Sequence, residues 1–299
     1  MRNHLLLFIF CLIVSVSEGQ AVRLDSLTHW RKAFKSSLNL NQASFSSNWK
    51  SGGVNSLGFN AMINYRASYK ADGTSWENEI DLLYGMVNNA GQGYRKTLDR
   101  IYLDTKVGRQ LTKNWDMYAA TNFLTQFAPG YRYTTVNGVE EATLISGFLA
   151  PGFLTTSLGF EYHPVKYFKL RLSPFAPRLT FVRNSSDYAD VDPVAPYGVK
   201  IGESVRYEWL SAQLLAEFDK NIATNINLKF RYLLFSNYET LGLKTTDQRL
   251  DLNVTAQLNK YINVSLGSIL LYDVDQDSGL QLSQAFSLGI MYTFQNFAN

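Results

Sequence analysis

Apolar and polar residues alternate along segments of this chain that are longer than ordinary strands. Between Gly58 and Gly85 nearly every second residue is apolar, and residues such as Asn64, Arg66 and Glu79 lie at the positions between them. Successive side chains of a strand point to opposite faces, so this run predicts a hairpin with one apolar and one polar face. Such a hairpin covers the core of a soluble β-protein, or it separates lipid from the lumen of a membrane barrel.

The same alternation predicts about twelve strands. Several segments exceed the usual 5–6 residues of a strand and match the roughly 9–11 residues that cross a bilayer on a tilt. No stretch after the N-terminal segment approaches the roughly 20 apolar residues of a transmembrane helix. The segments centre on positions 38–40, 59–69, 76–84, 101–107, 115–127, 154–162, 168–172, 210–218, 222–234, 250–258, 262–272 and 286–294.

The connections between these segments alternate between short and long, as in outer-membrane barrels. The short ones are 70–74, 109–113, 163–167, 219–221 and 259–261. The long ones are 87–96, 128–146, 173–204, 235–247 and 274–282. Aromatic residues also gather near the predicted strand ends, where interfacial girdles occur. We therefore predict an all-β fold, a transmembrane antiparallel up-and-down β-barrel of about 12 strands, with 10 or 14 as alternatives.

The N-terminal segment is typical of an export signal. Arg2 precedes the apolar run 5–14, and small residues come before position 20. We predict a signal peptide over 1–19, a periplasmic N-terminal segment over 20–36 and the barrel over 37–296. These predictions place the protein in the outer membrane of a Gram-negative bacterium with both termini periplasmic. The only cysteine, Cys11, lies in the predicted signal peptide, so the mature chain has no disulfide or thiol chemistry.

Composition and motifs argue against nucleic-acid binding and against catalysis. The net charge of +3 is too small to indicate a nucleic-acid partner. Barrel enzymes generally need a histidine near the outer rim, but His29 precedes the first predicted strand and His163 lies in a predicted periplasmic turn. Known nucleophile, zinc and phosphate-loop motifs are absent from the sequence. We predict no enzyme activity and no catalytic residue, cofactor or metal site.

The polar face of the predicted strands should line the lumen. The candidate lumen residues are Asn64, Arg66, Glu77, Glu79, Asp81, Arg100, Asp104, Lys106, Lys169, Arg171, Lys229, Arg231 and Arg249. The acidic segment 77–81 and the basic later strands would roughly face each other in a twelve-stranded ring. Such a transverse field selects ions or orients solutes. Alternatively, lateral ion pairs of the acidic segment with Arg66, Arg100 and Lys106 fill the lumen, because buried charges need partners.

Three segments resemble an outer-membrane barrel family of the Bacteroidota that is known only as a domain of unknown function. They are NLNQASFSSNWKSGGVNS (39–56), KTLDR (96–100) and TQFAPGY (125–131). The resemblance implies an outer-membrane barrel but no substrate or reaction. Trp49, Asp99 and Gln126, which lie in these segments, are candidate residues of the outer rim. A functional rim site and a structural rim network are both open interpretations of them.

The function that these observations favour is a narrow, porin-like channel for small polar solutes. The alternative is a sealed structural or accessory barrel that acts in an outer-membrane protein complex. The expected partners are outer-membrane lipid, a small polar solute and, under the alternative, other proteins of such a complex.

Overall fold

The computed structural model describes residues 29–46 and 53–296 of the 299-residue chain. The wall strands are β1 Trp30–Ala43, β2 Ser56–Ala71, β3 Thr74–Asn89, β4 Gly93–Gln110, β5 Trp115–Thr125, β8 Gly152–Val165, β9 Phe168–Phe175, β12 Ser211–Ala223, β13 Ile226–Asn237, β14 Asp247–Gln257, β15 Ile262–Asp273 and β16 Asp277–Gln295. The shorter elements are β6 Gly130–Val136, β7 Val139–Ser146, β10 Arg178–Phe181, β11 Val205–Glu208, and the 3₁₀ helices η1 Ser185–Tyr188, η2 Pro196–Gly198, η3 Tyr238–Thr240 and η4 Leu243–Thr245. Each predicted segment corresponds to one wall strand.

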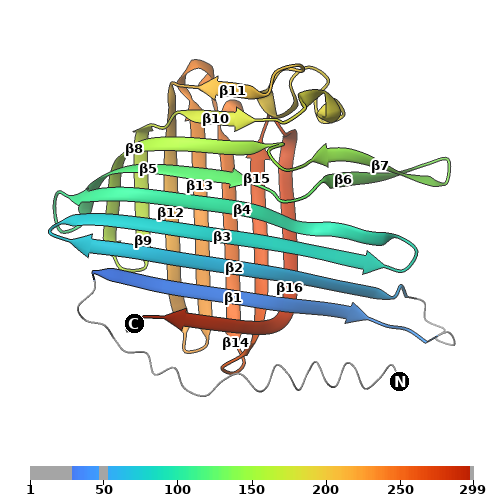
Figure 1. The fold of residues 1–299 in the computed structure, drawn as a ribbon, viewed down its shortest axis with the longest axis horizontal. Coiled ribbons are helices and arrows are strands. Elements are labelled where there is room, and N and C mark those ends of the chain that lie inside the picture. Colours follow the sequence, from blue (N-terminus) through green and yellow to red (C-terminus); the bar gives the residue numbers. More distant parts are fainter. Residues whose placement is uncertain (1–28, 47–52, 297–299) are drawn as a thin grey trace.

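The wall strands form a closed antiparallel barrel of twelve strands (Figure 1). Their order around the ring is β8-β5-β4-β3-β2-β1-β16-β15-β14-β13-β12-β9. Pairing of β1 with β16 and of β8 with β9 completes the ring, which leaves no open sheet edge in the wall. The predicted fold class is therefore confirmed. None of the described helices has the length and apolar character needed to span a membrane.

Towards the long loops the barrel wall bends at two places, between β9 and β10 and between β11 and β12. Near the short turns β8 pairs with β9, and farther out it pairs with β10, because the chain bends at Ala176 and Pro177. β12 and β11 follow the same bend on the other side. At the seam, any side chain at Gly159 would collide with the carbonyl oxygen of Leu172, so the close approach of β8 and β9 requires glycine there.

Several predicted connections are wrong in extent. The segments 87–96 and 274–282 were expected to be long loops, but β3 and β4 join through 90–92 and β15 and β16 through 274–276. Their polar sequences reflect strands that reach beyond the apolar belt into water. The segment 219–221 is also strand, and the turn lies at 224–225. The predicted loop 128–146 holds the β6–β7 hairpin.

The first strand starts earlier than expected. β1 begins at Trp30, which is aligned with Tyr69 of β2, so the barrel includes part of the segment 20–36 that was expected to precede it. Charged residues at 31–32 hide the alternation at this end. The predicted signal peptide lies outside the described residues.

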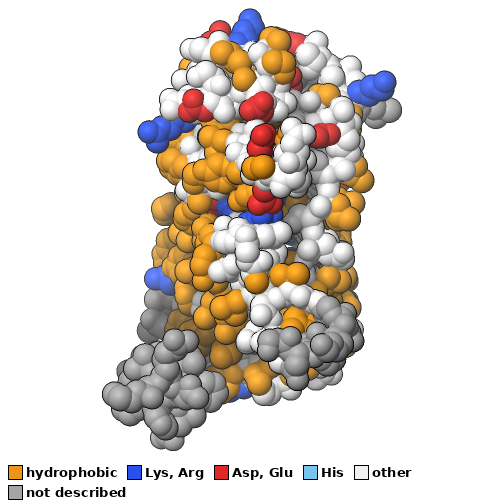
Figure 2. All heavy atoms as spheres, turned by 90° about the vertical axis from the view of Figure 1, so that its right-hand side faces the viewer, with side chains coloured by type: hydrophobic (Ala, Val, Ile, Leu, Met, Phe, Trp, Pro, Cys, Tyr) orange, Lys and Arg blue, Asp and Glu red, His pale blue; other side chains and the backbone are white. Residues whose placement is uncertain are grey.

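The outer face of the wall is apolar. Along β16 every second residue from Phe286 to Phe294 is apolar and exposed, for example Phe286 at 68% and Leu288 at 51%. Figure 2 shows hydrophobic side chains over much of the flanks and charged side chains gathered towards the upper end. At the short-turn end Trp30 packs against Tyr69 and Trp76, with ring centroids 5.4 and 5.6 Å away. These features match a surface in contact with lipid and bounded by an aromatic girdle.

The loops at the opposite end form a compact cap with its own small core. Ala150, Val182, Tyr188, Tyr197 and Val199 are buried together. The hydroxyl of Tyr197 also donates a hydrogen bond to the carbonyl of residue 145 at the end of β7. The cap therefore holds the β5–β8 and β10–β11 connections against each other.

Candidate functional site

All thirteen predicted lumen residues take part in one arrangement of polar contacts inside the barrel. Glu79 of β3 lies at its centre. Its carboxylate oxygens lie 2.6 Å from Arg231, 3.1 Å from Arg66 and 3.6 Å from Lys229. Asn64 donates a hydrogen bond of 2.9 Å to the same carboxylate. Because β3 and β13 are six places apart in a ring of twelve, the Glu79–Arg231 pair crosses the lumen.

A second set of ion pairs lies nearer the short turns. Lys106 contacts Glu161 at 2.5 Å and Glu77 at 3.2 Å, and Lys169 contacts Glu77 at 2.8 Å. Arg171 contacts Glu161 at 3.2 Å. Lys106 and Glu161 are 1% and 2% exposed, so these charges are separated from bulk water. Two further contacts of Arg171 complete the set, with Asp104 at 3.0 Å and Glu217 at 3.9 Å.

A third set lies towards the long loops. Arg100 of β4 contacts Asp81 at 2.8 Å and Asp251 at 3.1 Å, and Arg249 contacts Asp251 at 2.9 Å. β4 and β14 are also six places apart in the ring, so the Arg100–Asp251 pair is a second bridge between opposite walls.

We call these ion pairs the lumen network, and its charges balance. Its eight cations are Arg66, Arg100, Lys106, Lys169, Arg171, Lys229, Arg231 and Arg249. Its eight anions are Glu77, Glu79, Asp81, Asp104, Glu161, Glu217, Asp219 and Asp251. Balance is what a dry interior requires, because an unpaired buried charge is costly.

Both interpretations of the lumen charges describe part of what the structure shows. The predicted lateral pairs form, since Glu79 contacts Arg66, Asp81 contacts Arg100 and Glu77 contacts Lys106. The acidic strand also faces basic side chains on the opposite wall. Sequence reasoning missed Asp219 because the segment 219–221 was taken as a turn. Its 3.5 Å contact with Arg66 is a third bridge between opposite walls.

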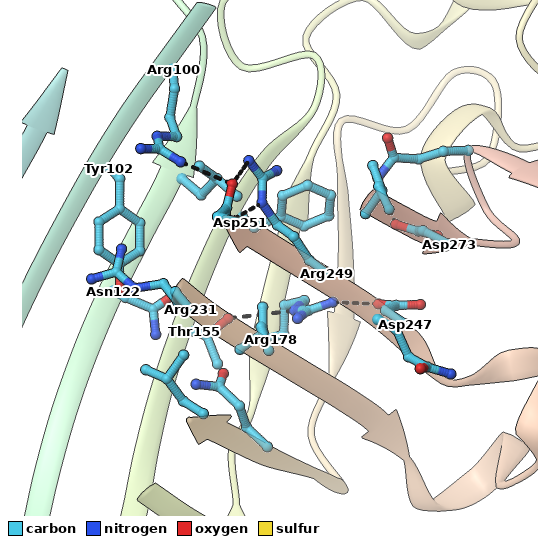
Figure 3. Close-up of a pocket in the computed structure, with 18 residues that line it drawn as sticks. Arg100, Tyr102, Asn122, Thr155, Arg178, Arg231, Asp247, Arg249, Asp251 and Asp273 are labelled. Atoms are coloured by element: carbon cyan, nitrogen blue, oxygen red, sulfur yellow. Dashed lines mark hydrogen bonds and ion pairs between the residues drawn. The ribbon is translucent and has the colours of Figure 1, made fainter. Parts of the chain in front are cut away.

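A cavity lies on the long-loop side of the lumen network (Figure 3). It holds about 800 Å³ of atom-free space, part of it continuous with solvent. Arg100, Arg231 and Asp251 of the network belong to its lining, together with apolar residues such as Leu215 and Phe153. Its other charged groups are Arg249 of the network and, at strand ends, Arg178, Asp247 and Asp273.

Arg178 is the most constrained charged residue of this cavity. Its guanidinium lies 3.2 Å from the ring centre of Phe235 and 5.3 Å from that of Phe153. It donates a hydrogen bond of 2.7 Å to Asp247. Cation–π stacking and a charged hydrogen bond together fix the side chain in one orientation. The cavity thus presents a preorganised mixture of charged, aromatic and aliphatic groups, as ligand sites do.

The rim candidates form a structural network that anchors a loop. Asp99 accepts hydrogen bonds from the backbone N–H groups of Phe127 at 2.7 Å and Ala128 at 3.0 Å. Lys96 contacts Asp99 at 2.9 Å and donates to Gln126 at 3.0 Å. These contacts join KTLDR to TQFAPGY, two of the three segments that sequence reasoning singled out, and they attach the loop after β5 to β4. Trp49 lies outside the described residues.

Comparison with known proteins gives a partial family match and a set of barrel structures. Residues 40–131 match a family model described as "Protein of unknown function (DUF3078)". No curated protein sequence matches. The structure is similar to an outer membrane channel from Pseudomonas putida F1, with a TM-score of 0.38, 9% identity, and 93% of this chain and 99% of that chain covered.

Two other solved structures are similar at the same level. The translocator domain of the autotransporter NalP from Neisseria meningitidis has a TM-score of 0.37, 9% identity and 91% coverage of each chain. The NanC porin has a TM-score of 0.37, 8% identity, and 87% of this chain and 98% of that chain covered.

Proposed function

We propose that this protein is an outer-membrane barrel whose lumen is closed by ion pairs and whose outward-facing cavity binds a small polar solute. The apolar outer face and the closed ring support the membrane location, because lipid tolerates spanning strands only in a closed barrel. In this orientation the short turns and both termini are periplasmic, and the capped end faces outward.

The observation that carries the closure is the set of ion pairs between opposite walls. Glu79–Arg231 and Arg100–Asp251 each join strands six places apart, and both pairs lie on direct paths across the lumen. An ion that passes this level must separate partners that are largely shielded from water. The balanced charges also leave no net charge at this level that would draw ions of one sign through it.

Solute binding is supported by the composition of the cavity. A ligand there meets guanidinium groups, carboxylates and apolar side chains within one enclosure. This combination fits a small molecule that carries both charged and apolar groups better than it fits a bare ion. We propose binding rather than catalysis, because the network carboxylates are already held by cations.

Gated passage of the bound solute is the second candidate function. It is favoured because, among the described residues, side chains of the wall strands form the floor of the cavity. A ligand that pairs with Arg231 or Asp251 competes with the bridges between the walls. The lumen would then open only while such a ligand is bound.

Conductance in a planar lipid bilayer tests the closure. We expect the purified protein, verified as folded by heat-modifiable migration in a gel, to give no steady current at low voltage. A double variant Arg100→Ala with Arg231→Ala removes these two bridges, leaves the longer and more exposed Arg66–Asp219 contact of 3.5 Å, and should conduct. Glu140→Gln is the control and should stay closed. It breaks the ion pair between Glu140 of the exposed β6–β7 hairpin and Arg95 of β4. A steady current through the unmodified protein would overturn the proposal.

A further inference from the structure

A histidine and two carboxylates meet at the short-turn mouth of the barrel, away from the cavity. Asp116 of β5 and Glu161 of β8 are direct cross-strand partners. His163 lies two residues beyond Glu161 on the same strand, so its side chain points to the same face. One ligand atom from each of the three residues lies within 4.8 Å of the others. In Figure 1, β5 and β8 run side by side along the wall.

Sequence reasoning placed no metal site here, and it took His163 for a turn residue. The structure instead places His163 within β8, with its backbone N–H bonded to the carbonyl of Asn114 at 2.9 Å. This bond holds the imidazole beside the carboxylate of Asp116.

The charge of Asp116 is not compensated by the lumen network. The residue is buried, at 7% exposure, and within the described part of the chain its one ion-pair contact is His163, which carries charge only when protonated. Glu161, by contrast, is satisfied by Lys106 and Arg171. Two carboxylates directly opposite each other on neighbouring strands repel. An additional cation at this point would remove that repulsion.

Two buried atoms of the cluster also lack hydrogen bonds. Among residues 29–46 and 53–296, the Oδ1 atom of Asp116 and the Nε2 atom of His163 are buried and have no hydrogen-bond partner. They face each other at 3.2 Å. Two ligands of a tetrahedral zinc ion with bonds of about 2.0–2.1 Å are about 3.3 Å apart. The pair therefore has the spacing of two ligands around one such ion.

We propose that Asp116, Glu161 and His163 bind a divalent transition-metal ion, for which Zn²⁺ is the probe. Imidazole and carboxylate are both ligands of Zn²⁺, and three protein ligands leave a fourth position for water. His163 is 23% exposed at its side chain and lies at the short-turn mouth, the end from which an ion would enter. The bound ion would join β5 to β8 where the wall begins and would stabilise the folded barrel.

Zinc binding by the folded barrel in detergent tests the proposal. We expect one Zn²⁺ per chain by isothermal titration, and a rise in the unfolding temperature when Zn²⁺ is added. Asp116→Asn and His163→Asn should each weaken Zn²⁺ binding by about tenfold or more, since even outer-shell changes cost metal sites 10–100-fold. Both variants should also lose the Zn²⁺-dependent rise in unfolding temperature.

His29→Asn is the matched control, because His29 packs on Tyr69 at the same end of the barrel. It should leave Zn²⁺ binding unchanged. Heat-modifiable migration shows that each variant is folded. If the unmodified protein binds Zn²⁺ no better than the folded Asp116→Asn and His163→Asn variants, the proposal fails. Asp116 and His163 then form only a polar contact within the wall.

Discussion

Replacing Glu79 by glutamine tests whether the lumen network is shielded from water. Glutamine keeps the shape of the side chain and removes its charge. The change breaks charged contacts with Arg231 at 2.6 Å and Arg66 at 3.1 Å. Glu79 and Arg231 are 12% and 11% exposed at their side chains, so this ion pair is largely, though not fully, buried.

The expected cost follows from the surroundings of the pair. Two unit charges about 4 Å apart attract by about 4 kcal/mol at an effective dielectric constant of 20. Part of the loss is offset, because Arg231 retains Glu217 at 2.8 Å and Arg66 retains Asp219 at 3.5 Å. Breaking a buried pair from one side typically costs about 3–5 kcal/mol, and we expect a free energy of unfolding lower by that amount.

Urea unfolding of the barrel in lipid vesicles, followed by tryptophan fluorescence, measures this free energy. Glu140→Gln is the reference, because Glu140 pairs with Arg95 at 2.5 Å but is 42% exposed. An exposed pair is worth at most about 1 kcal/mol. A cost for Glu79→Gln no larger than that of Glu140→Gln would mean that water screens the network, and it would refute the closed lumen.

Four other outcomes follow from the same structure. Glu79→Ala leaves the network with a net positive charge, and Arg231→Ala leaves it with a net negative charge. Any currents through these two variants should have reversal potentials of opposite sign in a KCl gradient. Reversal potentials of the same sign would contradict the charge balance. Asp99→Ala removes an ion pair and two backbone hydrogen bonds, and should destabilise the attached loop by about 1–3 kcal/mol, seen as faster amide exchange there and nowhere else. Hydrogen bonds from the backbone N–H groups of residues 195 and 194 lower the pKa of Asp192, so they stabilise this turn at neutral pH and the stabilisation is lost as the pH falls through the lowered pKa. An NMR titration of these two amides should therefore have a midpoint below about 3.9, the usual pKa of aspartate. A midpoint at or above that value would contradict the prediction. Ile63→Arg places a charge on the lipid-facing side at the middle of β2 and should cost about 2–4 kcal/mol in unfolding experiments, whereas a negligible cost would argue that this face does not meet lipid.

The strand count was predictable because the two faces of the wall meet different surroundings. Lipid selects apolar residues at every second position, and that selection extends along the full width of the bilayer. Where strands rise above the bilayer the selection ends, so the outer parts of β3 and β4 appeared to be loops. The kink at Pro177 had the same effect on β10. Strand ends outside lipid carry no alternating pattern and must be found from the structure.

The lateral part of the lumen network was predictable, and the part that crosses the lumen was predictable only in outline. Neighbouring strands in an up-and-down barrel follow chain order, which pairs Glu79 with Arg66. Contacts across the ring depend on strand tilt and side-chain length, which no sequence pattern states. The cluster of Asp116 with Glu161 depends on the register of β5 against β8, two strands separated by the long capped loop. The alternation of apolar and polar residues predicted only that both side chains lie on the lumen face.

Under the proposed gated passage, the balanced network also determines what kind of solute could open the barrel. A ligand with a single negative charge that binds Arg231 would displace Glu79 and leave that carboxylate without its closest cation. The gain from one new pair is then cancelled by the loss of another. A single anion also adds an uncompensated negative charge to the balanced network, whereas a ligand with both a negative and a positive group adds no net charge and can pair with Arg231 and Asp251 together, both of which line the cavity. Such an exchange replaces two network pairs by two ligand pairs at little net electrostatic cost. If the barrel passes a solute by this route, zwitterionic compounds are the class that its charges admit.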